Sequence, residues 1–124
     1  MQSKLDKITL GKYGEKIACE FLRKNKYTII TQNFKCKQGE IDIIAKDLNY
    51  KDIVFVEVKT RTNLNYGIAS EAVNKNKIEH IYKSAQFYIL KNNIKNQNIR
   101  IDVIEIYIKL KEKKVIVNHI KNIF

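Results

Sequence analysis

Two segments at the centre of the chain constrain the fold most, because both alternate aliphatic and charged residues with the period of a β-strand. They are Glu40–Ala45 and Ile53–Thr60, and the polar stretch 46–52 joins them. Side chains at i and i+2 share one face of a strand, so each segment has an aliphatic face and a face that carries charge. The expected aliphatic faces are Ile41, Ile43 and Ala45 in the first segment and Val54, Val56 and Val58 in the second. The pattern predicts an antiparallel hairpin.

The charged faces of this hairpin bring like charges together. A turn centred between residues 49 and 50 places Asp42 opposite Glu57, and Glu40 opposite Lys59. Directly opposed side chains have Cβ atoms roughly 4.5–5.5 Å apart. Two carboxylates at that separation repel each other unless a cation lies between them or one of them is protonated. The sequence therefore predicts a cation-binding or proton-sharing site on the hairpin.

The rest of the chain predicts two helices and three more strands. Apolar residues at steps of three and four indicate one helix with the face Leu10, Tyr13, Ile17, Ala18, Phe21, Leu22 and another with the face Ile78, Ile81, Tyr82, Ala85, Tyr88, Ile89. Asn74 and Ser70 are candidate caps for the second helix. The remaining predicted strands are Tyr27–Phe34, Ile99–Leu110 and Val115–Ile120. We therefore expect a single α/β domain over residues 1–124, with a mixed central β-sheet flanked by helices and the order α-β-β-β-α-β-β.

The residue types on the hairpin suit a hard divalent cation. Mg²⁺ prefers oxygen ligands and is commonly held by one or two carboxylates together with water and substrate phosphate. Such a metal polarises a phosphodiester and lowers the pKa of an attacking water. Lys59, two residues beyond Glu57 on the same face, is placed to orient that water or to stabilise charge on the phosphorane. A Glu-x-Lys pair alone is typical of a solvated salt bridge; its combination with Gly39–Asp42 at hairpin spacing indicates function.

The same residues carry a family resemblance. An aspartate followed by Glu-x-Lys on a central hairpin, after a helix with a glutamate, resembles the PD-(D/E)XK nuclease superfamily. The motifs are similar to those of the YraN family, small bacterial proteins that resemble archaeal Holliday-junction resolvases. They are Gly11-x-x-Gly14-Glu15-x-x-Ala18, Asn33-Phe34, Gly39-Glu40-Ile41-Asp42-Ile43-Ile44, Phe55-Val56-Glu57-Val58-Lys59-Thr60-Arg61 and Ala72-Val73-x-x-x-Lys77. The resemblance spans about residues 9–110.

This resemblance implies a restriction-endonuclease-like core and a Mg²⁺-dependent endodeoxyribonuclease that acts on structured or branched DNA, with Mn²⁺ as a substitute metal. It implies that the metal ligands are Asp42, Glu57, the Val58 carbonyl and the helical Glu15, and that Lys59 is the catalytic lysine. From its place on the hairpin, Glu40 is expected to support the site by pairing with Lys59; the alternative is a surface charge. The family pattern has proline where this chain has Ile41, but that proline is often absent from the superfamily.

The charge balance favours a polyanionic partner. The 124 residues contain 24 Lys+Arg and 13 Asp+Glu, a formal net charge of +11. Residues near the expected site that suit contact with the DNA backbone are Arg61, Lys75, Lys77 and Lys83. The alternative for the three lysines is a solvated helix face in a chain with 21 Lys and 21 Ile, a bias that A/T-rich codons also produce.

Several other classes are disfavoured. No apolar run exceeds four residues, so no membrane span is expected. The first residues lack the apolar stretch of a secretory signal, and Cys19 and Cys36 do not form a Cys-x-x-Cys pair. We therefore expect a cytoplasmic protein without disulfides or a zinc site. A non-catalytic nucleic-acid-binding or adaptor module with the nuclease fold is the alternative function, and a homodimer, as in the resolvases, is a further expectation.

Overall fold

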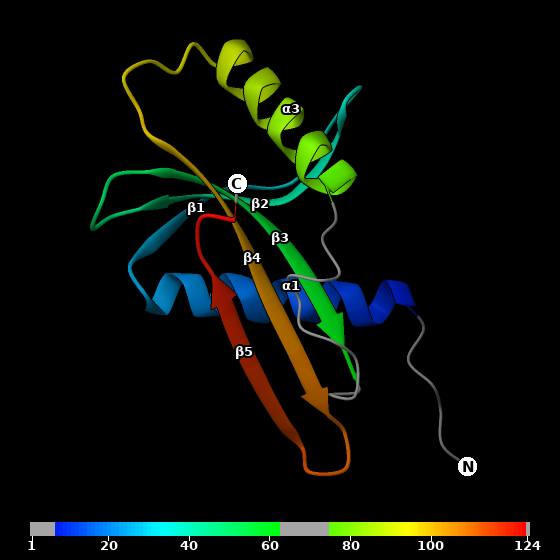
Figure 1. The fold of residues 1–124 in the computed structure, drawn as a ribbon. Coiled ribbons are helices and arrows are strands. Elements are labelled where there is room, and N and C mark those ends of the chain that lie inside the picture. Colours follow the sequence, from blue (N-terminus) through cyan, green and yellow to red (C-terminus); the bar gives the residue numbers. More distant parts are fainter. Residues whose placement is uncertain (1–6, 63–74, 124) are drawn as a thin grey trace.

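The computed structural model describes residues 7–62 and 75–123, which form one five-stranded sheet and two helices (Figure 1). The elements are α1 (Lys7–Lys24), β1 (Tyr27–Cys36), β2 (Gly39–Asp47), β3 (Ile53–Arg61), α3 (Lys75–Lys91), β4 (Ile99–Lys109) and β5 (Lys114–Ile120). The strands lie in the order β1-β2-β3-β4-β5. Only β3 and β4 are parallel, and α3 lies in the crossover between them. The fold class expected from the sequence is confirmed, and so is the order of its elements. The two candidate caps for α3, Asn74 and Ser70, lie outside the described residues.

Each face of the sheet is covered by one helix. On one face Ala18 and Leu22 of α1 pack on aliphatic residues of the three central strands. On the other face Ile81 and Ala85 of α3 pack against a cluster that includes Phe55 of β3. The predicted helix faces therefore form the core, except at Tyr13 and Tyr82, which are 48% and 36% exposed. None of the helices in the described ranges is long and apolar enough to cross a membrane.

The predicted hairpin register is confirmed over the part of the hairpin that is paired. Ile43 pairs with Val56 and Lys46 pairs with Ile53, as the turn position requires. The β2–β3 pairing ends at Ile43, although β2 remains paired to β1 as far as Gly39 and β3 remains paired to β4 as far as Arg61. The two central strands therefore part just before Asp42 and Glu57.

The predicted aliphatic face of β2 is wrong at one residue, Ile41. Ile41 does not share a face with Ile43, because it packs with the cluster beneath α3 while Ile43 packs with the cluster beneath α1. The change of face coincides with an irregular backbone. Asn33, which lies between the residues of β1 that pair with Ile41 and Ile43, has φ of 53°. A residue with positive φ interrupts the regular pleat on which period-two alternation depends.

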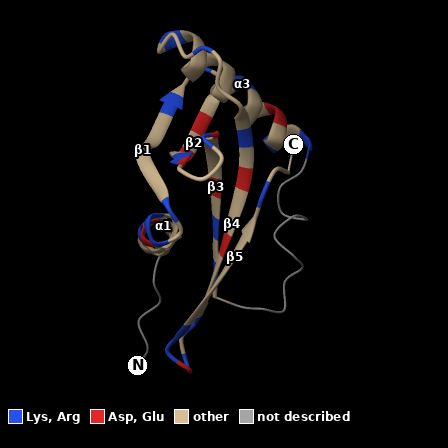
Figure 2. Ribbon diagram, turned by 90° about the vertical axis from the view of Figure 1, so that its left-hand side faces the viewer, with Lys and Arg blue, Asp and Glu red and all other residues tan. Residues whose placement is uncertain are grey.

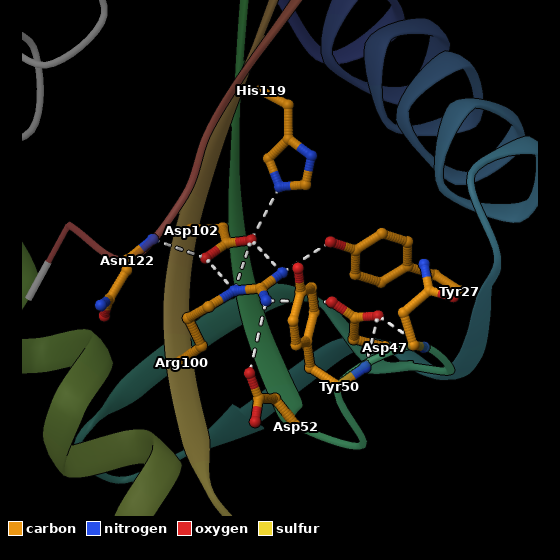
Figure 3. Close-up of polar contacts among 9 residues, drawn as sticks. Tyr27, Asp47, Tyr50, Asp52, Arg100, Asp102, His119 and Asn122 are labelled. Carbon is orange, nitrogen blue, oxygen red and sulfur yellow. Dashed lines mark hydrogen bonds and ion pairs between the residues drawn. The ribbon is translucent and has the colours of Figure 1, made fainter.

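A buried ionic network lies beside the turn between β2 and β3, at the opposite end of the hairpin from Asp42 and Glu57 (Figure 3). Arg100 of β4 donates to Asp102 at 3.0 Å, to Asp47 at 3.0 Å and to the Tyr27 hydroxyl at 2.6 Å. Asp102 also lies 2.7 Å from Nε2 of His119 and accepts from the backbone N–H of Asn122 at 2.9 Å. The network joins β1, β2, β4 and β5, because each strand contributes one or more of its members.

Candidate active site

The predicted carboxylates meet Arg61 and Lys77 around a cavity of about 450 Å³ where β2 and β3 part, and Lys59, which does not line the cavity, contacts Glu57. Its lining comes from α1, β2, β3 and α3 and consists of Leu10, Gly11, Glu15, Glu40, Asp42, Glu57, Val58, Thr60, Arg61, Thr62 and Lys77. The gap between the strands explains why both helices reach the same space. Glu15 approaches from the α1 face and Lys77 from the α3 face.

Glu57 is the most enclosed carboxylate of this site, at 5% exposure. Its Oε2 atom lies 3.4 Å from Nζ of Lys59 and 3.4 Å from Nζ of Lys77. Lys59 belongs to the same strand, whereas Lys77 lies in the first turn of α3. Two ammonium groups from different elements therefore share one carboxylate oxygen, which compensates the cost of burying its charge.

Asp42 stands at the point where β2 leaves β3. Its Oδ2 atom accepts a hydrogen bond of 2.8 Å from the backbone N–H of Val58, so the carboxylate satisfies a donor of β3 beyond the last β2–β3 pair. Burial and the nearby charge of Glu57 raise the pKa of Asp42 to about 7, against an ordinary value of 3.8. Placing Asp42 and Glu57 together therefore has the electrostatic cost that the sequence predicts.

Glu15 reaches the cavity because α1 packs closely on β3 at the preceding residue. Gly14 is buried, and a Cβ atom at that position would lie 1.8 Å from Oγ1 of Thr60. Only glycine allows this approach. Burial raises the pKa of the Glu15 carboxyl, a hydrogen bond with the Asn33 side chain opposes that effect, and the charges of Glu40 and Glu57 add to it.

Gly14→Ala is expected to destabilise the protein by about 1–3 kcal/mol, because the new methyl group overlaps Thr60 and must push α1 away from β3. Chemical denaturation at equilibrium measures this change. Gly11→Ala is the matched control, since nothing lies within 4 Å of a Cβ atom there and alanine favours a helix over glycine by about 1 kcal/mol. Equal stability of both variants would contradict the close contact at Gly14.

Comparison with known proteins identifies the family. Residues 14–106 match the family described as "Uncharacterised protein family UPF0102". A UPF0102 protein of Caldanaerobacter subterraneus subsp. tengcongensis is 52% identical over 98% of both chains. A UPF0102 protein of Caldicellulosiruptor saccharolyticus is 45% identical over 97% of this chain and all of its own length, and one of Clostridium botulinum is 47% identical over 93% of both. The chain belongs to the UPF0102 family.

UPF0102 is the YraN family, so the family predicted from the sequence motifs is confirmed. A solved structure, that of Pyrococcus furiosus SfsA in complex with Ca²⁺, is similar with a TM-score of 0.37 and 13% sequence identity. That alignment covers 91% of this chain and 63% of the SfsA chain.

The donor set of this UPF0102 protein fits a metal held by few protein ligands. The described residues contain no group of three or more His, Cys, Asp or Glu side chains arranged to hold a metal ion. Two carboxylates, Asp42 and Glu57, do lie together, and the charge of Glu57 adds to the effect of burial in raising the pKa of Asp42. A divalent cation would relieve the repulsion between them, and Mg²⁺ commonly uses one or two carboxylates and completes its shell with water and phosphate. Glu15 and the Val58 carbonyl stay predictions as further ligands.

Glu40 and Lys59 do not form the expected pair, and two of the lysines predicted to contact DNA do not line the cavity. Glu40 is exposed at the rim of the cavity, and Lys59 pairs with Glu57 instead of with Glu40. The reason is the parting of the strands, which ends cross-strand contact before Glu40 reaches Lys59. Lys75 and Lys83 are exposed on α3 and do not line the cavity, whereas Arg61 and Lys77 do.

Sequence reasoning missed one buried acid beside the predicted lysine. Glu105 of β4 is 1% exposed and is the neighbour of Lys59 in the parallel pairing. Its carboxylate accepts hydrogen bonds from the Tyr107 hydroxyl and, at 2.9 Å, from the Asn118 amide. The available signal was an acidic residue within the otherwise apolar run 103–108.

Proposed function

We propose that this UPF0102 protein is a Mg²⁺-dependent endonuclease that hydrolyses phosphodiester bonds of structured or branched DNA. The observation that carries the proposal is the convergence of Asp42, Glu57 and Lys59 where the central strands part. The charge of Glu57, together with burial, raises the pKa of Asp42, and Lys59 contacts Glu57. Family membership agrees with this proposal, because the matched region, residues 14–106, contains all three residues.

Each residue has a role that follows from its position. Asp42 and Glu57 would hold the metal, which when bound polarises the scissile phosphate and acidifies an attacking water. Lys59, 3.4 Å from Glu57, orients that water or stabilises negative charge that develops on the phosphorane. Arg61 lines the same cavity two residues further along β3 and is placed to contact a substrate phosphate.

DNA as the substrate is supported by charge. The net charge of +11 provides the sequence-independent attraction on which binding to a phosphate backbone depends. The preference for branched DNA comes from the resemblance of the family motifs to archaeal Holliday-junction resolvases. Mn²⁺ is expected to substitute for Mg²⁺, because both take oxygen ligands.

A cleavage assay tests the proposal. The chain is incubated with an end-labelled four-way junction, a linear duplex of the same sequence and a single strand, with Mg²⁺, with Mn²⁺ or with EDTA. Metal-dependent cleavage, strongest on the junction, is the expected result. Binding of these DNAs without cleavage under any condition would instead favour a non-catalytic nucleic-acid-binding or adaptor module.

Lys77→Met is expected to raise the affinity of the protein for Mg²⁺ by up to about fivefold while DNA affinity falls. In the structure the Lys77 ammonium lies 3.4 Å from the same Glu57 oxygen that would bind the metal, so it competes with the cation. An energy of about 1 kcal/mol, the size of a partly exposed ion pair, corresponds to about a fivefold change. Calorimetric titration with Mg²⁺ measures it.

Lys83→Met is the matched control for Lys77→Met, because Lys83 lies on the same helix, is exposed and does not line the cavity. It should leave the Mg²⁺ affinity unchanged. Weaker Mg²⁺ binding by the Lys77 variant than by the control would show that Lys77 supports the metal site instead of competing for it.

A further inference from the structure

Three cavities meet at Glu15, and two of them lead away from the candidate active site along α1. The cavity of the candidate active site shares four lining residues with a cavity of about 610 Å³ between the start of α1 and the strands β1 and β2. They are Gly11, Glu15, Glu40 and Asp42. A third cavity of about 350 Å³ continues between α1 and the middle of β1, and it also includes Glu15. Together the second and third cavities form a path that we call the α1–β1 groove.

The lining of the α1–β1 groove suits a phosphate backbone. Its basic residues are Lys12, Lys16 and Arg23 of α1 and Lys35 of β1, and its amide side chains are Gln32 and Asn33. Its acidic residues are Glu20, which lies near Arg23, and the site carboxylates Glu15, Glu40 and Asp42. Glu40 and Asp42 lie at the end of the groove where a metal would bind, and Lys35 lies with them in the second cavity. The third cavity, farther along α1, is lined by the basic residues Lys12, Lys16 and Arg23 and by the acidic residues Glu15 and Glu20.

The basic residues of α1 form one row. Lys12, Lys16 and Arg23 are spaced by four and seven residues, which places them on one side of a helix. Figure 2 looks nearly along α1 and shows β1 rising beside it. The row from residue 12 to residue 23 is about 17 Å long at 1.5 Å per residue.

We propose that the α1–β1 groove holds a single strand of DNA and leads it to Asp42 and Glu57. The groove is bounded by a helix on one side and a strand on the other, and the three cations on α1 form one row, as contact with one phosphate backbone requires. The substrate of the proposed nuclease is therefore a DNA with a single-stranded segment next to the cut. This inference rests on the proposed function only for cleavage of the strand at Asp42 and Glu57. Binding of the strand in the groove does not depend on it.

The test compares two variants with the same change of charge. The groove variant carries Lys12→Gln, Lys16→Gln and Arg23→Gln. The control variant carries Lys91→Gln, Lys95→Gln and Lys111→Gln, which are exposed positions outside the described cavities. Binding of a fluorescent single-stranded 12-mer and of a blunt duplex of that length is measured by anisotropy, in EDTA, over a series of salt concentrations.

The groove variant is expected to bind the single strand about tenfold more weakly than the wild type at low salt. The slope of log affinity against log salt should become shallower by about 2, because three phosphate contacts at about 0.7 each are lost. The control variant should stay within about twofold. Equal losses in both variants, no loss in the groove variant, or an equal loss for single strand and duplex would each overturn the proposal.

The outcomes also separate the groove from the catalytic proposal. Because these measurements exclude metal, a protein that binds single strands through the groove and never cleaves DNA would contradict the nuclease function alone. A protein that cleaves DNA with Mg²⁺ and whose groove variant binds single strands normally would contradict the groove alone. An Asp42→Asn protein should bind the single strand as tightly as the wild type or more tightly, since it has lost a negative charge.

Discussion

Asp42→Asn is expected to lower Mg²⁺-dependent cleavage of DNA by roughly 100- to 1,000-fold, because it removes one of the two carboxylates that we propose hold the metal. The variant keeps the fold, since an amide oxygen can still accept the 2.8 Å hydrogen bond from the Val58 N–H. Single-turnover cleavage of a labelled junction measures the effect. Glu112→Gln is the control, because Glu112 is exposed in the β4–β5 turn and does not line the cavity. Cleavage by Asp42→Asn at the wild-type rate would exclude this site.

The same variant should also be more stable than the wild type when no metal is present. The pKa of Asp42 is about 7 in the folded protein and 3.8 ordinarily, so the folded state holds a proton that the unfolded state has lost between these values. The stability of the wild type therefore falls as pH rises from about 4 to about 7 and stays low above that range. At pH 8, Asp42→Asn should gain roughly 1–2 kcal/mol in urea denaturation. A loss of stability would show that Asp42 is structural.

Arg100→Met is expected to destabilise the protein by about 3–5 kcal/mol, because it leaves buried carboxylates without their cation. Asp47 and Asp102 are 2% and 0% exposed, and Arg100 contacts both at 3.0 Å (Figure 3). A domain whose whole stability is about 5–15 kcal/mol would be close to unfolding. The shift in the midpoint of urea denaturation measures the loss in free energy of unfolding, provided that the dependence of this free energy on urea concentration is the same in both proteins.

Arg100→Lys separates charge from geometry in this network. A lysine keeps the positive charge but cannot reproduce the fork by which one guanidinium reaches Asp47, Asp102 and Tyr27 at once. It should therefore recover part of the stability that Arg100→Met loses. Full recovery would mean that charge alone holds the strands together, and a loss equal to that of Arg100→Met would mean that the hydrogen-bond geometry is decisive.

The elements and the hairpin register could be predicted from the sequence because both depend on local periodicity. Period-two alternation indicated the strands, and the assumption of a turn centred between residues 49 and 50 placed Ile43 opposite Val56, as the structure confirms. The expected pairs Asp42–Glu57 and Glu40–Lys59 assumed that the same ladder continued. It does not, because Asp42 uses its side chain, instead of its backbone, to satisfy the next donor of β3. A side-chain acceptor in place of a backbone acceptor leaves no trace in hydrophobic periodicity.

The remaining differences come from contacts between residues far apart in the chain. Lys77 was expected to contact DNA. Its ion pair with Glu57 follows from how α3 packs across the sheet. The Arg100 network joins residues from 27 to 122 and has no short motif. One signal was present, since the chain has 21 Lys but only 3 Arg, and a buried fork-shaped contact is where arginine cannot be replaced by lysine.

The most direct test of the central claim is calorimetric titration of Mg²⁺ into the wild type and into Glu57→Gln at pH 8, with and without a four-way junction. Lys59 and Lys77 stay unchanged, so only the shared carboxylate is altered. We expect saturable binding to the wild type, tighter with the junction, and its loss in Glu57→Gln. Absence of binding to the folded wild type in both conditions, or equal binding by both proteins, would contradict a metal site at Asp42 and Glu57.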